Sequence, residues 1–264
     1  MHACLELSGR EGPWHTGRMK LAGRTAIVTG GSRGIGRGIV LAFAREGADV
    51  AINYRRDEAA ARETADQVRA LGRRAEIYQG DVAEWPAMET MFAEAGKTFG
   101  GFDIVVANSG VASRTASVVD TDPGYWAKVL AVDLNGVFFT CKAGVPLLRA
   151  QGNVIVVSSI GADLCAPYGA PYYVAKAGAN ALVKVLAKEL APERKRVNCI
   201  APGMVASDMG NRLVATLGEG VVNTIPLGRI GQPEDIGAAA VFLASSEASF
   251  ITGKILRIDG GVFM

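Results

Sequence analysis

Short runs rich in Val and Ile alternate with helix-length segments along most of this chain. The segments between them carry the 3.6-residue apolar period of amphipathic helices, as in residues 58–71 and 232–243. This alternation predicts βαβ units whose near-continuous apolar strands are buried on both faces of a parallel sheet. The predicted strands are RTAIVTG (24–30), ADVAINY (48–54), RAEIYQ (74–79), FDIVVAN (102–108), NVIVVSS (153–159), RVNCIA (196–201) and ILRID (255–259). We therefore expect an α/β fold with a doubly wound, seven-stranded parallel sheet and helices on both faces, which is the Rossmann architecture.

Length and composition fit one large domain. The chain has 264 residues, of which 49% are hydrophobic and 20% are charged. The folded pattern begins at Met19, and residues 1–18 lack the apolar core of a signal peptide, so we expect a flexible N-terminal extension followed by a single domain over 19–264. Residues 202–226 form the longest connection without an obvious strand, which suits a lid over a substrate.

Charge and cysteine usage exclude several classes of partner. The net charge of +2 is small and the basic residues are spread along the chain, so we do not expect binding to nucleic acid or to an anionic membrane. Gly, Ser, Asn or a charge interrupts every apolar run before it reaches the ~20 residues of a membrane helix. The four cysteines are isolated, which predicts reduced thiols in a cytoplasmic protein.

Acid–base chemistry in this chain must do without histidine. His2 and His15 both precede the predicted domain, which excludes most hydrolase triads and His-ligated metal sites, and we expect no metal. Tyr172 is followed four residues later by Lys176. On a helix these side chains share one face, so the ammonium favours ionisation of a phenol whose ordinary pKa is near ~10. The alternative is a chance pair on a helix surface, so the spacing alone does not establish a function.

A glycine-rich turn, TGGSRGIG (29–36), follows the first predicted strand and leads into a predicted helix. Its spacing departs from G-x-G-x-x-G, but backbone N–H groups at a helix N-terminus would still approach a pyrophosphate closely. The alternative is a tight turn without a ligand. The residues that we expect to bind a dinucleotide here are Gly30, Ser32, Arg33, Gly34, Ile35 and Gly36.

The end of the second strand predicts which dinucleotide is bound. A free ribose 2′-hydroxyl calls for an acidic residue there, but the sequence has Asn53, Tyr54, Arg55 and Arg56. Arg55, Arg56 and Arg33 suit a 2′-phosphate, so we expect NADP(H) rather than NAD(H). The alternative is that these arginines are solvated surface charges. Asp81 and Val82 follow the third strand, where they would contact adenine.

Further motifs follow in a fixed order. They are Asn108-Ser109-Gly110, Asn135, Ser159, Tyr172-x-x-x-Lys176, Pro202-Gly203, Ile251-Thr252-Gly253 and Ile258-Asp259-Gly260-Gly261. With the glycine turn and Asp81-Val82, this set resembles the short-chain dehydrogenases/reductases over residues 20–262, most closely the 3-oxoacyl-acyl-carrier-protein reductase type. One departure is that the family's Asn-Asn-Ala-Gly is Ala107-Asn108-Ser109-Gly110 here, which removes one bracing amide and adds a hydroxyl.

The resemblance implies a role for each catalytic residue. Ser159 would hydrogen-bond the substrate oxygen, and Tyr172 would transfer the proton. Lys176 would hold the nicotinamide ribose and lower the phenol pKa, while Asn135 would anchor a proton-relay water. The cofactor contacts implied beyond the glycine turn are Asn53, Tyr54, Arg55, Asp81, Val82, Asn108, Gly110, Tyr172, Lys176, Pro202, Gly203, Val205 and Ser207.

The positions expected to border the substrate are mainly apolar: Val111, Ala112, Cys165, Ala166, Tyr168, Met204, Met209 and Leu213. They favour a ketone or a 3-oxoacyl thioester over a small charged acid. We therefore expect an NADPH-dependent carbonyl reductase. The alternatives are an NADP-dependent sugar, polyol or secondary-alcohol dehydrogenase, and a noncatalytic NADP(H)-sensing protein.

The resemblance also implies partners. It implies an acyl carrier protein, as in fatty acid or polyketide metabolism, although the basic run at 194–196 is more typical of a helix C-terminus than of a docking site. It further implies a homotetramer that pairs the helix of Tyr172 and Lys176 through its small residues Ala175 and Ala179.

Overall fold

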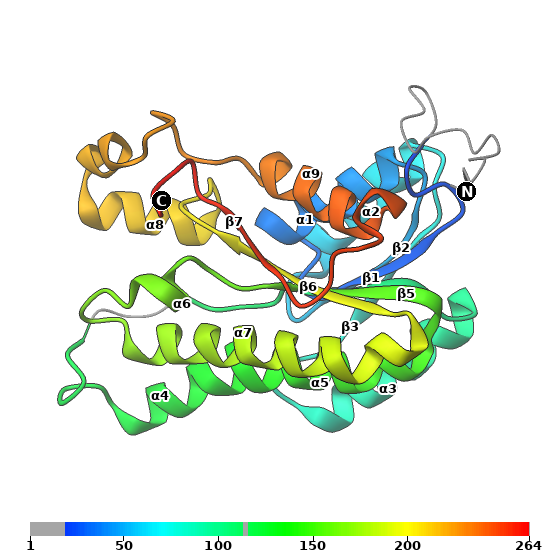
Figure 1. Cartoon of the computed structure of the whole chain (residues 1–264), viewed down its shortest axis with the longest axis horizontal. Coiled ribbons are helices and arrows are strands. Elements are labelled where there is room, and N and C mark those ends of the chain that lie inside the picture. The colour runs from blue at the N-terminus through cyan, green and yellow to red at the C-terminus, as the bar shows by residue number, and fades with distance from the viewer. Residues whose placement is uncertain (1–18, 113–115, 264) are drawn as a thin grey trace, which may run out of the picture.

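Parallel strands form one sheet through the centre of the molecule (Figure 1). The computed structural model describes residues 19–112 and 116–263, so the predicted extension 1–18 lies outside the described residues. The seven strands have the order β3-β2-β1-β4-β5-β6-β7, which confirms the predicted doubly wound α/β fold. Their bounds are β1 (Thr25–Val28), β2 (Asp49–Tyr54), β3 (Ala75–Gln79), β4 (Phe102–Ala107), β5 (Leu148–Val157), β6 (Arg196–Pro202) and β7 (Ile255–Ile258).

Helices cover both faces of the sheet and bury a separate apolar cluster on each (Figure 1). One layer consists of α1 (Gly34–Arg45), α2 (Glu58–Ala70) and α9 (Pro233–Ala244). The other consists of α3 (Trp85–Phe99), α5 (Gly136–Gly144) and α7 (Ala170–Leu190). Successive residues of β4 point to opposite faces of the sheet, so Ile104 packs in the first cluster and Val105 in the second. The strand order reverses between β1 and β4, which places the ligand crevice at the carboxyl ends of these strands.

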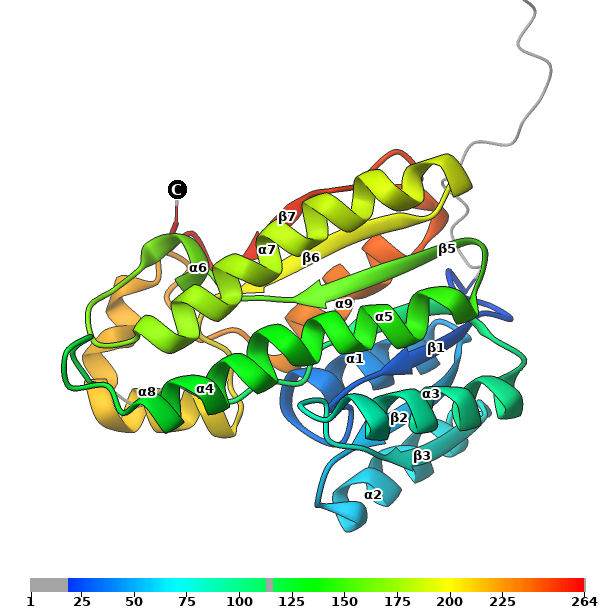
Figure 2. The same ribbon diagram turned by 90° about the horizontal axis from the view of Figure 1, so that it is seen from below.

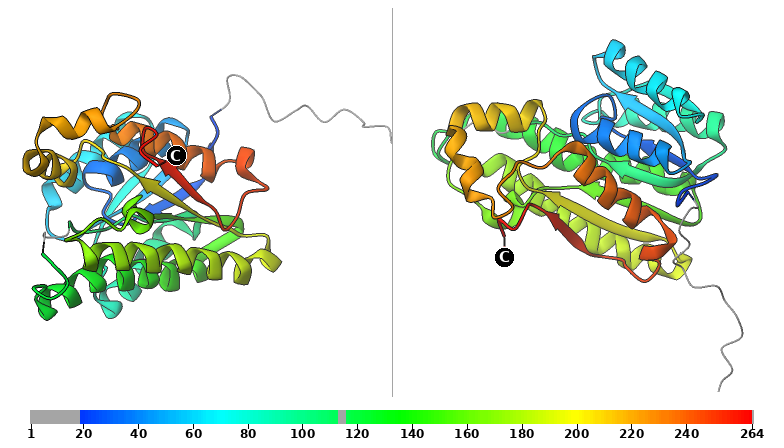
Figure 3. Two further views of the ribbon diagram at one scale, coloured as in Figure 1. Left: turned by 60° about the vertical axis from the view of Figure 1, so that its left-hand side comes forward. Right: turned by 90° about the horizontal axis from the view of Figure 1, so that it is seen from above.

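The carboxyl ends of the strands carry the remaining helices. The arrow of β5 points toward α6 (Gly161–Leu164) and α8 (Asp208–Leu217) in Figure 2. The predicted lid segment therefore contains a helix, and it lies at the ligand end of the sheet. Figure 3 shows the chain after β7 beside the segment that follows α8, where Leu227 N donates to Gly260 O (3.1 Å).

One helical stretch, Pro123–Leu147, is long and apolar enough to cross a membrane by length and composition, although the sequence predicted no such segment. It comprises α4 (Pro123–Leu130), a π-helical turn (Ala131–Asn135), α5 and a final 3-10 turn. Val129, Val137 and Cys141 are buried along it, and α5 packs against α3 and α7. The buried side of this stretch is thus part of the core of the domain.

The structure corrects one expectation about α7. Ala175 and Ala179 were expected to pair with another subunit, but both are fully buried within this chain. Their small side chains allow α7 to lie close to its own neighbours. The outer face of α7 instead presents Val174 and Val185, each about half exposed.

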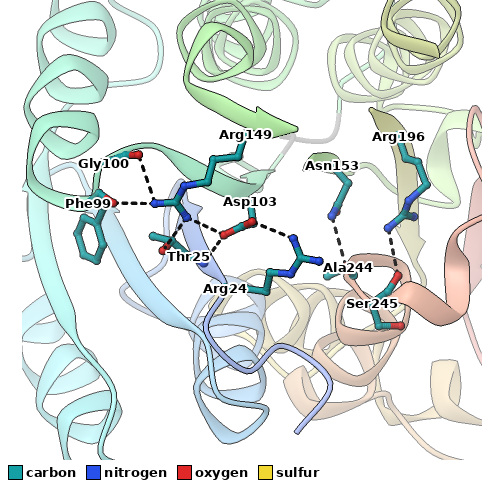
Figure 4. Close-up of polar contacts among 10 residues, drawn as sticks. All are labelled: Arg24, Thr25, Phe99, Gly100, Asp103, Arg149, Asn153, Arg196, Ala244 and Ser245. Atoms are coloured by element: carbon teal, nitrogen blue, oxygen red, sulfur yellow. Dashed lines mark hydrogen bonds and ion pairs between the residues drawn. The ribbon is translucent and has the colours of Figure 1, made fainter. Parts of the chain in front are cut away.

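A polar network ties the strands together at their amino ends, opposite the ligand crevice (Figure 4). The carboxylate of Asp103, near the start of β4, accepts a hydrogen bond from Thr25 N (2.9 Å) and pairs with Arg24 (2.9 Å) and Arg149 (2.8 Å). Arg149 also donates to Phe99 O (2.9 Å). Asp103 is thus the common acceptor that joins β1, β4 and β5.

We expect Asp103→Ala to lower the free energy of unfolding by about 2–4 kcal/mol, because two ion pairs are lost and a buried backbone N–H loses its acceptor. Urea unfolding at fixed protein concentration measures the change. The matched control is Asp163→Ala, which breaks a more exposed pair with Arg257 and should cost less than about 1 kcal/mol. Equal losses in the two variants would show that the Asp103 network does not stabilise the sheet as described.

Candidate active site

The turn after β1 is rich in glycine and leads directly into the N-terminus of α1. Gly30 and Gly34 have positive φ angles of 63° and 53°, which favour glycine. A Cβ on Gly36 would lie 2.2 Å from Gly30 O, so no side chain fits at this position. Arg33, the N-cap of α1, makes no side-chain cap hydrogen bond, so the first backbone N–H groups of this helix remain available to a ligand. This geometry fits the pyrophosphate of a dinucleotide.

Two asparagines brace this turn. Asn108, just after β4, donates from Nδ2 to Thr29 O (2.9 Å) and Gly30 O (3.2 Å). Asn53, at the end of β2, accepts from Gly30 N (3.1 Å) and donates to Gly80 O (3.1 Å). Asn53 was predicted to contact the cofactor directly. Its amide is buried and bonded within the protein, so the structure gives it a bracing position instead.

The arginines expected to select a 2′-phosphate lie in the open. Arg33 precedes α1 and pairs with Asp208, the first residue of α8, at 3.2 Å. Arg55 follows β2 and lies 3.7 Å from Asp81. Both arginine side chains are exposed, and both can turn toward a ligand at the expense of a weak surface pair.

Tyr172 and Lys176 lie on one face of the first turns of α7. Lys176 Nζ is 5.6 Å from the centroid of the Tyr172 ring. Ser158, just after β5, donates from Oγ to Lys176 O (3.3 Å), which ties the end of this strand to α7. The next residue, Ser159, accepts a hydrogen bond from Gly161 N at its Oγ (3.0 Å). That acceptor role leaves the Ser159 hydroxyl proton available to a substrate.

Asn135, the predicted anchor of a proton-relay water, is the last residue of a π-helical turn before α5. Its side chain is exposed, whereas the polar side chain beside Lys176 is that of Asp133. Asp133 is fully buried, with Oδ1 3.2 Å from Lys176 Nζ and Oδ2 accepting from Val111 N (3.1 Å). Both residues lie in the π-helical turn 131–135, where positions two apart point in different directions. Asp133 is therefore the side chain that contacts the lysine, and the proposed role of Asn135 as anchor of a proton-relay water stays a prediction.

Burial and charge act in opposition on this pair. Burial alone lowers the pKa of Lys176, but its interactions with neighbouring groups, above all the charge of the Asp133 carboxylate, raise it above the ordinary 10.5. Burial raises the pKa of Asp133, while the ammonium and the Val111 N–H offset part of that rise. Lys176 is therefore held as an ammonium at neutral pH.

The loop after β4 connects the two halves of the site. Ser109 Oγ lies 2.8 Å from where a Cβ on Gly30 would lie, and Lys176 Nζ lies 3.4 Å from the Cβ position of Gly110. The short loop 108–110 therefore contacts the glycine turn at Ser109 and Lys176 at Gly110. A dinucleotide on the turn can reach the Tyr172 side of the crevice along this loop.

Other predicted cofactor contacts lie after β6 and after β3. Along the segment after β6, Gly203 N donates to Ile258 O (2.9 Å), Val205 is buried, and Ser207 lies against Gly34, with a 3.4 Å separation of their Cβ positions. Val82 is buried against Gly136, so its side chain belongs to the core.

The predicted substrate rim is described in part. Exposed residues are Ala112, Cys165, Ala166 and Tyr168, and half-buried residues are Val111, Met204 and Met209. The side chain of Leu213 lies outside the described residues. Cys165 and Tyr168 have positive φ angles of 45° and 69°, so the loop before α7 is strained. The described residues of this set are mainly apolar, and their place beside a substrate stays a prediction.

Comparison with known proteins agrees with this geometry. A family profile described as enoyl-(acyl carrier protein) reductase matches residues 30–263. The 3-oxoacyl-acyl-carrier-protein reductase FabG of Staphylococcus aureus is 36% identical over 243 residues, covering 91% of this chain and 98% of the relative. The 3beta-hydroxysteroid dehydrogenase 1 of Eggerthella lenta is 38% identical over 248 residues, covering 92% and 94%. A short chain dehydrogenase from Burkholderia cenocepacia in complex with NADP superposes with a TM-score of 0.86 at 32% identity, covering 92% of this chain and 99% of the other.

Proposed function

Because the chain belongs to the short-chain dehydrogenase/reductase family of oxidoreductases, we propose that it is an NADPH-dependent carbonyl reductase with Tyr172 as its proton donor. The observation that carries this proposal is the pairing of Tyr172 with a buried, charged Lys176. The pair faces the same crevice as a turn that fits a pyrophosphate. Turnover of ketones with NADPH tests the proposal.

The residues present suit carbonyl reduction. A bound nicotinamide would supply the hydride. Ser159 would donate its hydroxyl proton to the carbonyl oxygen, since its Oγ already accepts from Gly161 N. Tyr172 would protonate the alkoxide as it forms, and Lys176 would hold the nicotinamide ribose while its charge faces the phenol.

NADP(H) is the proposed cofactor. Arg33 and Arg55 are exposed at the adenosine end of the glycine turn, and no carboxylate occupies the end of β2. The Burkholderia cenocepacia neighbour was solved with NADP, which supports the same choice here.

We expect NADPH to bind about ten- to a hundredfold more tightly than NADH, because a charge-assisted contact to the 2′-phosphate contributes about 1.5–3 kcal/mol. Arg33→Ala and Arg55→Ala should each weaken NADPH and leave NADH unchanged, as measured by calorimetry. Arg37→Ala, which removes an arginine of α1 that pairs with Glu63 of α2, serves as the control. Equal Kd values for the two cofactors would contradict the assignment. Asn53→Asp is unsuitable as a switch because the amide of Asn53 donates to Gly80 O.

The proposed substrate is a ketone or a 3-oxoacyl thioester, with an acyl carrier protein as the proposed carrier. The apolar rim and the FabG relative support this class. The basic run at 194–196 gives no separate support, because Lys195 pairs with Glu193 and Arg196 donates to Leu243 O (2.8 Å).

A second candidate is oxidation of an apolar secondary alcohol. The 3beta-hydroxysteroid dehydrogenase relative is similarly close at 38% identity, and the same side chains would run the reaction in reverse. A panel of ketones, acyl thioesters and secondary alcohols, followed by NADPH absorbance, separates the two directions.

A cytoplasmic homotetramer is the proposed assembly. The exposed apolar residues Val174 and Val185 on α7 and Phe138 on α5 support an interface on this face. Light scattering at micromolar concentration measures the assembly directly.

A further inference from the structure

Asp133 contributes a charge that the proposed reaction does not account for. Its carboxylate has no exposed surface, and the side chain of Lys176 is only 4% exposed. Oδ1 lies 3.2 Å from Lys176 Nζ, and Oδ2 accepts from Val111 N. Nζ also donates to Val157 O (3.2 Å), so the ammonium has partners on two sides.

Burial makes the protonation of Lys176 depend on the Asp133 carboxylate. An amine without water around it loses its proton more easily, and a carbonyl such as Val157 O compensates only partly. A carboxylate in contact supplies a full opposite charge. Asp133 is thus the partner that keeps the lysine charged where solvent does not reach.

The surrounding backbone closes over the pair. A Cβ on Gly110 would lie 2.8 Å from Asp133 Oδ1 and 3.4 Å from Lys176 Nζ, although Gly110 does not have a positive φ. A side chain at position 110 would therefore displace the ion pair, although the backbone conformation there does not demand glycine. The loop after β4, the π-helical turn and α7 meet at these two charges.

We propose that Asp133 is a positioning residue, whose carboxylate fixes Lys176 Nζ as a charged ammonium facing Tyr172. Its effect on turnover rests on the proposed reductase function, but the ion pair itself can be measured without cofactor or substrate. Among the described residues, the titratable groups that act on Lys176 are Asp133 from the π-helical turn, Tyr172 from α7 itself and Cys199 from β6. Burial raises the pKa of Cys199 to about 12, so it remains a neutral thiol across the neutral range.

The test compares the wild type with Asp133→Asn. Nuclear magnetic resonance of the lysine side chains in the cofactor-free protein, with Lys176→Met for assignment, measures the Lys176 titration. We expect the wild-type Lys176 pKa to lie above its ordinary 10.5. In Asp133→Asn it should fall by about one to three units, and the alkaline limit of kcat should move down with it. The control, Asp163→Asn, removes a carboxylate that pairs with Arg257 at the surface. It should shift neither the Lys176 pKa nor the alkaline limit of kcat.

A second variant and the wild type keep the proposal falsifiable if Asp133→Asn does not fold. Gly110→Ala would push the pair apart without removing a charge, so it should also lower the Lys176 pKa. A wild-type Lys176 that titrates at or below its ordinary value overturns the proposal. So does an unshifted Asp133→Asn, or an equal shift in Asn135→Ala. If no carbonyl compound is reduced, the proposed function fails, while the titration still decides the role of Asp133.

Discussion

Tyr172→Phe is expected to lower kcat by about 10²–10⁴-fold while NADPH still binds, because the variant removes only the hydroxyl that transfers the proton. The ring itself has a structural contact, an edge-to-face packing against Tyr173 with centroids 5.9 Å apart. Phenylalanine preserves that contact, so the fold should be unchanged. Steady-state kinetics and calorimetric binding of NADPH measure the two quantities separately.

Two neighbouring tyrosines provide matched controls. Tyr173 packs its ring against the backbone of Gly161 and Gly169, where added Cβ atoms would lie 2.6 and 2.5 Å from it. Tyr168 is exposed in the strained loop before α7, and the residue four positions later is Tyr172 rather than a lysine. We therefore expect Tyr168→Phe and Tyr173→Phe to retain turnover. If Tyr172→Phe stays active while either of these loses activity, another phenol is the donor.

The sheet could be predicted because its signal is local. Each strand is a short apolar run between glycine or polar residues, and parallel strands buried on both faces need no cross-strand information to be recognised. The start of β5 was not predicted, because it lacks this local apolar pattern. Residues 148–152 read as polar and irregular, yet Leu148 pairs with Phe102 before a break in register. Only tertiary pairing assigns that stretch to the sheet.

The sequence predicted which side chains lie together where spacing along one helix decides it, as for Tyr172 and Lys176. The prediction missed a contact where the partner comes from another element. Asp133 is a single carboxylate within an apolar helical run, and a charge at such a position signals a buried partner. That signal was available in the sequence. The identity of the opposite charge was not available there, because the ion pair joins the π-helical turn to α7, more than forty residues further along the chain.

Lys176→Met is expected to damage both stability and turnover. The methionine side chain retains most of the packing volume of lysine, but Asp133 then remains as a buried carboxylate without its counter-charge. Breaking one partner of a buried ion pair costs about 3–5 kcal/mol in the free energy of unfolding. Differential scanning calorimetry at fixed subunit concentration should show a lower Tm.

The double variant Lys176→Met/Asp133→Asn separates the two effects. Removing the stranded charge should recover most of the lost stability, because a neutral amide is far less costly to bury than an unpaired carboxylate. Turnover should stay low, because the double variant still lacks the ammonium that would face Tyr172 and hold the ribose. A single variant as stable as the wild type would mean that the two charges are not coupled in the fold. A double variant with wild-type kcat would show that the ammonium of Lys176 is not required for proton transfer.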